Sequence, residues 1–339
     1  MKYNFIVISN NIKKTKKDLY YYAFREANRL NNSIFDYFYP NNNIFRFFFS
    51  PIINKIINLP FKKIFLEKRI DRYSKIFQSK SNICFLLFQN CIRFEKYGFS
   101  RLIRKKYPNS KIVYFFQDLV KKDKKKEEFL NNNRNIPDLI YSYDYGDAKK
   151  YNLKFHNIPY SDVSGLFSNV KINYDISFVG QAKDRLDDII SAYKTLKGQG
   201  LKCGFFIVGA TEEQQILKNE INYCDFIPYK DYLKIVAESK CMLEIMQKGG
   251  TGNTIRVSEA IAFDKLLISN NKMLLQNSFY DSKYMRVYEN LEEIDVKVFI
   301  EAHQEVHYEN KEKIYPSTFF KQIEKDLNEL DSNNLEKKK

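Results

Sequence analysis

A turn rich in glycine and threonine, followed by an amphipathic helix, holds the residue types that bind phosphate. The turn consists of Gly249, Gly250, Thr251 and Gly252. Its glycines let the backbone approach a ligand closely, and Asn253 or Thr254 can cap the helix that follows. Backbone N–H groups and the positive end of the helix dipole then point at one place. The pattern therefore predicts a phosphate site.

Charged side chains flank this turn. Lys248 and Arg256 add positive charge, and Glu259 lies about one helical turn further on, where it can reach the hydroxyls of a sugar. The alternative is an ordinary helix with a glycine-rich cap, because short motifs also occur by chance.

Composition favours a globular protein of two domains. The chain has 339 residues, of which 44% are hydrophobic and 16% aromatic. We find neither an apolar stretch long enough to cross a bilayer nor the pattern of a signal peptide in the first ten residues. These features predict a cytoplasmic protein.

Cysteine and histidine give little sign of a metal site. The five cysteines are scattered without a C-x-x-C pair, and the histidines are His156, His303 and His307. The sequence has no D-x-D motif. His303 and His307 have the spacing of metal ligands on one helix face, but a solvated helix face explains them better. We therefore expect neither a metal nor a resident cofactor.

The net charge of +15 is unevenly distributed. Residues 1–170 contain 32 Lys and Arg against 14 Asp and Glu, which gives +18, whereas residues 171–339 contain 24 against 27, which gives −3. Eight of the eleven glycines lie in the second half. The first half is thus suited to an anionic surface or substrate, and the second to a nucleotide-like ligand.

Strand-like and helix-like runs alternate along both halves, which predicts two α/β domains with parallel sheets. The expected strands are 4–9, 83–89, 111–117, 139–143, 175–180, 203–209, 225–228, 240–246 and 266–269. Two segments interrupt the first half: an aromatic and basic stretch at 44–70, and a lysine run at 121–126 that suits a solvated loop or helix face. A helix at 316–330 has one apolar side.

In their order these motifs resemble those of the GT-B glycosyltransferases, and more closely the bacterial enzymes that build lipopolysaccharide, capsule and other surface polysaccharide. The resemblance is clearest between residues 174 and 271. It implies two Rossmann-like domains facing a cleft: an N-terminal acceptor domain at 1–168 and a C-terminal donor domain at 169–315. The C-terminal helix and tail, 316–339, would pack back on the N-terminal domain.

The resemblance also implies roles for individual residues. Gly180 and Gln181 match the glycine turn after the first strand of the donor domain, and Lys183 and Arg185 match residues that hold the donor diphosphate. Alternatively, Lys183 and Arg185 form surface ion pairs with nearby aspartates. Pro228 and Tyr229 match the segment that borders the nucleotide base, and Glu259 matches the glutamate that holds the ribose. The residues that match the phosphate-facing segment are Gly250, Thr251, Gly252, Asn253, Thr254 and Arg256.

One position departs from the pattern. Many retaining members carry a second glutamate eight positions before Glu259, where this chain has Thr251. The stereochemistry of transfer is therefore left open.

Transfer without a metal requires Lys, Arg and helix N-termini to stabilise the leaving diphosphate. An inverting enzyme also needs a base to take the acceptor proton. Asp118 is the first candidate and Asp144 the second, since each follows an expected strand, but a turn or cap is the more common role of aspartate at such positions.

The resemblance implies a metal-independent enzyme that moves a sugar from a nucleotide sugar, a UDP-sugar, to a surface glycan or a lipid-linked glycan. The segment 44–70 can lie on an anionic membrane surface or pack between helices. The runner-up is a non-catalytic protein that binds nucleic acid or an anionic surface, although no nucleic-acid motif accompanies the basic half. A sugar-nucleotide epimerase is a third possibility.

Overall fold

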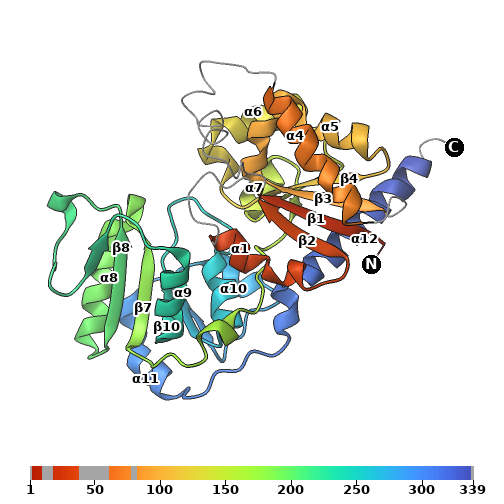
Figure 1. Cartoon of the computed structure of the whole chain (residues 1–339). Helices are drawn as coiled ribbons and strands as arrows, with labels where there is room; N and C mark the ends of the chain where they lie inside the picture. The colour runs from red at the N-terminus through yellow and green to blue at the C-terminus, as the bar shows by residue number, and fades with distance from the viewer. Residues whose placement is uncertain (1, 10–17, 38–60, 78–81, 337–339) are drawn as a thin grey trace. The chain divides into compact units, whose positions relative to one another are not determined.

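The computed structural model describes residues 2–9, 18–37, 61–77 and 82–336. The chain divides into two compact units (Figure 1). The N-terminal unit contains residues 1–16, 24–157 and 316–339, and the C-terminal unit contains 17–23 and 158–315. Residues 158–168 thus belong to the C-terminal unit, although the boundary expected from the sequence lies after residue 168.

Each unit contains a parallel sheet, as the sequence predicts, and each of the two sheets has six strands, more than the four and five expected. The order in the N-terminal unit is β2-β1-β3-β4-β5-β6, and in the C-terminal unit β12-β11-β10-β7-β8-β9. The first sheet consists of β1 (Asn4–Ser9), β2 (Ser33–Tyr37), β3 (Ile83–Phe88), β4 (Lys111–Phe116), β5 (Leu139–Ser142) and β6 (Lys154–Phe155). The second consists of β7 (Tyr174–Gln181), β8 (Cys203–Val208), β9 (Asn222–Cys224), β10 (Ser239–Glu244), β11 (Leu266–Ser269) and β12 (Met285–Val287).

Helices connect the strands. Those of the N-terminal unit are α4 (Phe61–Asp71), α5 (Phe99–Lys106), α6 (Lys124–Asn133), α7 (Tyr145–Lys150) and α12 (Pro316–Glu336). Those of the C-terminal unit are α1 (Leu19–Ala23), α8 (Leu186–Gly198), α9 (Tyr229–Ala237), α10 (Ile255–Ala262) and α11 (Val296–Glu301).

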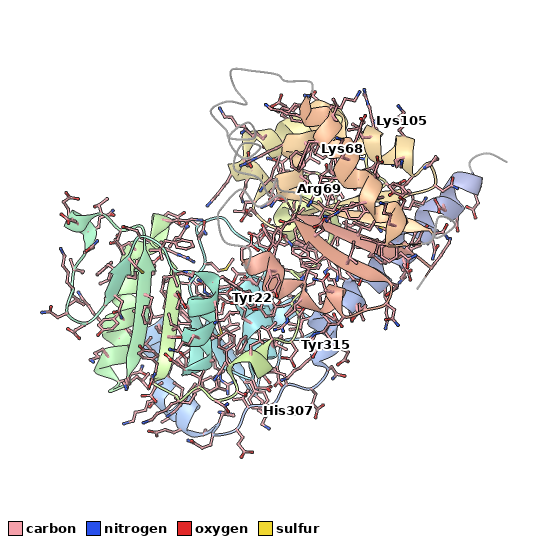
Figure 2. The ribbon with its side chains drawn as sticks, in the orientation of Figure 1. Tyr22, Lys68, Arg69, Lys105, His307 and Tyr315 are labelled. Carbon is pink, nitrogen blue, oxygen red and sulfur yellow. The ribbon has the colours of Figure 1, made fainter. Side chains whose placement is uncertain are left out.

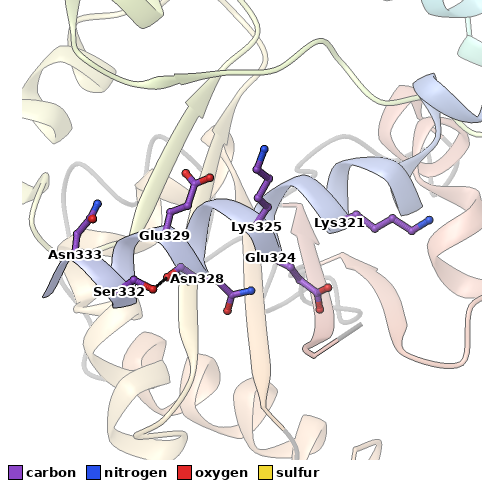
Figure 3. Close-up of a pocket in the computed structure, with 7 residues that line it drawn as sticks. All are labelled: Lys321, Glu324, Lys325, Asn328, Glu329, Ser332 and Asn333. Atoms are coloured by element: carbon purple, nitrogen blue, oxygen red, sulfur yellow. Dashed lines mark hydrogen bonds between the residues drawn. The ribbon is translucent and has the colours of Figure 1, made fainter. Parts of the chain in front are cut away.

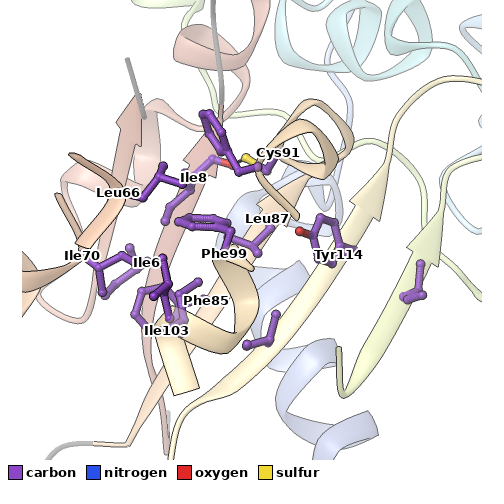
Figure 4. Packing of buried hydrophobic residues seen from close by; sticks show 14 of the residues in the cluster. Ile6, Ile8, Leu66, Ile70, Phe85, Leu87, Cys91, Phe99, Ile103 and Tyr114 are labelled. Atoms are coloured by element: carbon purple, nitrogen blue, oxygen red, sulfur yellow. Dashed lines mark hydrogen bonds between the residues drawn. The ribbon is translucent and has the colours of Figure 1, made fainter. Parts of the chain in front are cut away.

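The core of the N-terminal unit packs one face of its sheet against α4 and α5. Leu66 and Ile70 of α4 lie in the same buried cluster as Phe85 of β3 and Ile103 of α5 (Figure 4). The aliphatic and aromatic residues of these helices therefore explain why α4 docks on the sheet.

The C-terminal helix packs on the other face of the N-terminal sheet. The ring of Phe320 stacks on Phe5 of β1 at a centroid distance of 4.4 Å, and Phe319 contacts Phe115 of β4 at 5.0 Å. The hydroxyl of Tyr141 donates to Asp326. The apolar side of the helix thus covers the sheet of the first unit, as expected for a helix that returns to it.

Several sequence expectations are wrong in detail. The strand expected at 225–228 is instead β9, because Asn222 to Cys224 pair with β8 and Pro228 caps α9. The sequence pattern also missed β2, β6 and β12. His303 and His307 lie beyond the end of α11, so they do not share one helix face; Figure 2 labels His307.

The two basic segments also differ from expectation. Of segment 44–70, residues 44–60 lie outside the described residues and 61–70 form most of α4, with Lys62 buried and Lys63 exposed. In the lysine run, Lys126 is buried, and its Nζ donates to the carbonyl oxygen of Asp118 at 3.0 Å. A position that satisfies the ammonium with backbone carbonyls explains why this lysine is not solvated.

Candidate functional site

Two arginines converge on Gly180 near the end of β7. A methyl group at Gly180 would lie 2.7 Å from Nη2 of Arg256 and 3.1 Å from Nη2 of Arg185. Because a Cβ atom cannot come so close without displacing them, glycine is needed here to leave room for both guanidinium groups. The strand continues through Gln181, so the turn expected at Gly180 and Gln181 lies further along, at residues 182–185.

Backbone carbonyls hold both arginines in place. Arg185 donates from Nη1 to Ile245 and from Nε and Nη2 to Gln181, the latter two at 3.3 Å, and Arg256 donates from Nη2 to Val179. Both guanidinium carbons lie over the Phe178 ring, at 5.5 and 5.6 Å from its centre. The carboxyl ends of β7 and β10 therefore hold the two charged groups in position before a ligand binds.

Carboxylates act on the two arginines only from a distance: Glu244 and Asp184 favour the charged form of Arg185, and Glu259 interacts with Arg256. Among the ion pairs of the described residues, none includes Arg185 or Arg256. Burial, and then the neighbouring Arg256, lower the pKa of Arg185 to about 10. The alternative of surface ion pairs at Arg185 is wrong, because this side chain is buried and bonded to carbonyls. Two fixed like charges attract a dianion such as a diphosphate.

The glycine and threonine turn lies at the start of α10. The side chain of Thr254 accepts a hydrogen bond from the backbone N–H of Arg256 at 3.2 Å, so Thr254 is the cap. The Nδ2 atom of Asn271 donates to the carbonyl of Gly252 and to the side chain of Asn253, both at 3.2 Å. Asn271 thus fixes the turn against the end of β11.

Glu244 is a second buried acid that the sequence analysis did not select. It is 1% exposed at the end of β10, where its two carboxylate oxygens accept hydrogen bonds from the hydroxyls of Thr254 and Ser269. A single acidic residue inside the apolar run 240–246 was the available signal. The carboxylate binds the cap residue of α10 to two neighbouring strands.

Glu259 is fully buried, whereas the resemblance places its side chain against a ribose. The hydroxyls of Tyr229 and Tyr232 each donate to one of its carboxylate oxygens. Burial raises the pKa of Glu259 to about 7, although both tyrosines and Arg256 oppose the shift. The carboxylate is therefore held by protein groups alone in this state.

The other expected donor-site residues lie next to these in the chain. Lys183 is exposed and has a φ angle of +45°, in the left-handed region that few side chains adopt. Pro228 precedes α9 as its N-cap and Tyr229 is its first residue. Phe226, 58% exposed, precedes them and was not selected from the sequence.

The two candidate bases of the N-terminal unit have different surroundings. Asp118 is exposed just after β4, and Nε2 of Gln89 donates to its carboxylate at 2.5 Å. Asp144 is fully buried and caps α7 by accepting from the backbone N–H of Asp147 at 2.8 Å. Asp144 is thus a structural cap, and the expectation that it acts as a base is not supported by its burial.

A hollow of about 760 Å³ elsewhere does not belong to this site. It lies along α12 (Figure 3), and its lining residues are Lys321, Glu324, Lys325, Asn328, Glu329, Ser332 and Asn333. Because α12 supplies all of its lining residues among those described, it is an open helix surface and not an enclosed binding site.

Comparison with known proteins agrees with this architecture. Residues 187–314 match a family described as glycosyl transferase-like. The chain has the GT-B fold. No curated protein matches the sequence.

Solved structures of glycosyltransferases match nearly the whole chain. One is an alpha-glucosyltransferase in complex with UDP-glucose and DNA containing an abasic site, with a TM-score of 0.62 and 12% identity over 96% of this chain and 98% of that one. Another is an alpha-glucosyltransferase in complex with UDP, with a TM-score of 0.60 and 13% identity over 96% and 99%. An alpha,alpha-trehalose 6-phosphate synthase from Burkholderia multivorans has a TM-score of 0.50 and 9% identity over 100% and 99%.

The described residues offer neither a cluster of metal ligands nor a helix that could span a membrane. In the part of the chain that the structure describes, no group of three or more His, Cys, Asp or Glu side chains could hold a metal ion. No helix within the described ranges has both the length and the apolar character needed to cross a membrane.

Proposed function

We propose that this protein transfers a sugar from a UDP-sugar to an acceptor without a bound metal. The observation that carries the proposal is the convergence of Arg185 and Arg256 on Gly180, in the unit that matches a glycosyl transferase-like family. The pair supplies the positive charge that a departing diphosphate needs, and it is already oriented by strand carbonyls.

The start of α10 supports the same ligand. Thr254 caps this helix, and the glycines before it allow a phosphate to approach the positive end of the helix dipole. Lys183, exposed on the turn after β7, adds a third positive charge. In this proposal Glu259 binds the ribose, while Pro228 and Tyr229 border the base.

Acceptor activation is assigned to the N-terminal unit. Of the two aspartates considered, Asp118 has the exposed carboxylate, and Gln89 orients it through its side-chain amide. A carboxylate held in this way can take the proton of an acceptor hydroxyl as the new glycosidic bond forms, which an inverting mechanism requires.

For the acceptor we propose a surface glycan, including a lipid-linked one, reached by peripheral binding to the inner face of the cell membrane. The excess of +18 in residues 1–170 supports an anionic surface. Lys63 and Lys68 on α4 and Lys105 on α5 are exposed, and Figure 2 labels Lys68 and Lys105. Residues 61–70 also pack on the core, so only their exposed lysines are assigned to this role.

DNA is a second candidate acceptor. A DNA-bound alpha-glucosyltransferase has the same fold over 96% of this chain, and the basic first half would suit phosphates. Because that likeness is one of fold at 12% identity, it supports DNA as an arm of the experiment and not as the first choice.

The test is a UDP-release assay with several UDP-sugars in the presence of EDTA. Each donor is incubated with lipid-linked glycans extracted from bacterial membranes, with duplex DNA carrying hydroxymethylated bases, or with no acceptor. The proposal predicts that one glycan fraction stimulates UDP release and that EDTA leaves the rate largely intact. Stimulation by DNA alone would support the second candidate, and no stimulation by any acceptor would contradict both.

A further inference from the structure

The hydroxyl of Tyr229 lies between two partners. One is Glu259, to which it donates, and the other is Tyr160, whose hydroxyl oxygen is 3.1 Å away. Tyr160 is fully buried and Tyr232 is 9% exposed, whereas Tyr229 is half-buried at the start of α9. Tyr229 is therefore the more accessible of the two tyrosines that cover Glu259.

Segments at which the chain enters and leaves the C-terminal unit meet beside this network. The backbone N–H of Tyr160 donates to the carbonyl of Ile314 at 2.6 Å, and Ser258 of α10 donates to the carbonyl of Ile158 at 3.0 Å. Ser161 donates to the carbonyl of Ala23, and the ring of Tyr22 lies 5.6 Å from that of Tyr229. These bonds keep the Tyr160 hydroxyl in a fixed position.

Glu259 is fully buried, so a ribose can reach its carboxylate only if a side chain that covers it moves. Moving either tyrosine would break the hydrogen bond that it donates to Glu259. Losing the bond to Tyr232 would leave a buried hydroxyl without a hydrogen-bond partner, which costs free energy. The Tyr229 hydroxyl, by contrast, can turn its hydrogen to the Tyr160 oxygen 3.1 Å away and so keep one hydrogen bond.

We propose that nucleotide binding exchanges the Tyr229–Glu259 hydrogen bond for a ribose–Glu259 bond, with Tyr160 as the positioning residue that accepts the displaced Tyr229 hydroxyl. This inference rests on the proposed function, since it assigns the ribose of the UDP moiety to Glu259. It gives Tyr229 and Tyr160 opposite effects on affinity, which a merely structural role would not.

The test is calorimetric titration of UDP into the full chain and into three variants. Tyr229→Phe removes the competing hydroxyl, so UDP should bind about 3- to 10-fold more tightly. Tyr160→Phe leaves the displaced hydroxyl without its acceptor, so UDP should bind about 3- to 10-fold more weakly. The double variant should bind like Tyr229→Phe, because no hydroxyl then remains at position 229 to be satisfied.

Tyr193→Phe is the matched control. Its hydroxyl also donates to a glutamate of the C-terminal unit, Glu220 at 2.9 Å, but it contacts neither Glu259 nor Tyr229. UDP affinity should not change in this variant. Weaker binding in both Tyr229→Phe and Tyr160→Phe would overturn the exchange while leaving the proposed function standing. If the unmodified protein does not bind UDP, the proposed function fails as well.

A measurement on the unmodified protein covers the case in which a variant fails to fold. Protein labelled with carbon-13 at the tyrosine hydroxyl-bearing carbon should show tyrosine resonances that move when UDP is added, because the partners of two hydroxyls change. The Tyr193 resonance should stay in place. A spectrum in which no tyrosine resonance moves at saturating UDP would overturn the proposal.

Discussion

The guanidinium groups of Arg185 and Arg256 face the same Phe178 ring, with their central carbons 5.5 and 5.6 Å from its centre. Two positive charges so close repel each other, and carbonyl oxygens only partly offset that cost. An arrangement of this kind favours binding of an anion over stability of the free protein.

Replacing Arg256 by Ala should therefore weaken UDP binding by about 10- to 100-fold, the effect of losing one charge-assisted hydrogen bond. Stability should change little, because removing this charge also relieves repulsion on Arg185. Calorimetric titration and thermal melting measure the two effects. Arg286→Ala, at another arginine that donates to backbone carbonyls, is the control and should leave affinity unchanged. Equal affinity of Arg256→Ala and the unmodified protein would remove Arg256 from the site.

Gly180→Ala tests the space that the arginines occupy. The added methyl would lie 2.7 Å from Nη2 of Arg256, so the tip of that side chain must move. We expect UDP affinity to fall at least about 10-fold, a loss on the scale of one charge-assisted hydrogen bond, while the fold survives. Gly198→Ala, at the end of α8 with no atom within 4 Å of the new methyl, should keep full affinity. Retained affinity in Gly180→Ala would mean that the arginine positions do not matter.

Glu259→Gln tests the buried carboxylate through the pH dependence of stability. The pKa of Glu259 is raised from 4.5 to about 7, so the folded state prefers the protonated acid. Protonated Glu259 therefore stabilises the folded state. This stabilisation is fully present below pH 4.5 and is lost as the pH rises through about 7, a loss on the order of 3 kcal/mol.

Glutamine is neutral at every pH, so the unfolding free energy of the variant should equal that of the unmodified protein at pH 4.5. At pH 8 it should be higher by about 1–3 kcal/mol. UDP affinity should nevertheless fall, because the ribose loses a charged acceptor. Urea unfolding at the two pH values provides the measurement. A variant less stable than the unmodified protein at pH 8 would contradict the assigned protonation.

The membrane proposal predicts salt-sensitive binding to vesicles that contain anionic lipid. Lys63→Glu with Lys68→Glu, on the exposed side of α4, should reduce vesicle binding at least several-fold, at about 1 kcal/mol per charge near the surface. The same charge change at Lys194 and Lys197 of α8 is the control. Co-sedimentation at low and physiological salt measures the effect. Equal binding of both double variants, or binding to neutral vesicles alone, would count against a membrane role.

Much of the fold could be predicted because the periodicity of apolar residues and the spacing of turn residues are local properties of the sequence. The runs that became β1 and β11 have their expected bounds, since each is a short apolar run between polar residues. The edge strands β2, β6 and β12 could not be predicted in this way. They are short or partly exposed, and their pairing depends on neighbours distant in the chain.

For the candidate site, the sequence predicted which residues take part better than it predicted the surroundings of their side chains. The turn before α10 and its cap Thr254 follow from glycine and threonine preferences. The burial of Glu259 and Lys126 could not be foreseen, because it depends on tyrosines and carbonyls brought in by other elements. Glu244 was missed for the same reason, since its partners Thr254 and Ser269 belong to different segments.

A thermal-shift screen against UDP, GDP, CMP and ADP in the presence of EDTA tests the central claim most directly. A ligand at a hundred times its dissociation constant should stabilise the protein by roughly 2.7 kcal/mol. The donor site described here predicts that UDP raises the melting temperature of the unmodified protein more than the other nucleotides do, and that Arg256→Ala loses most of this rise. If none of the four nucleotides changes the melting temperature, the assignment of a nucleotide-sugar site is contradicted.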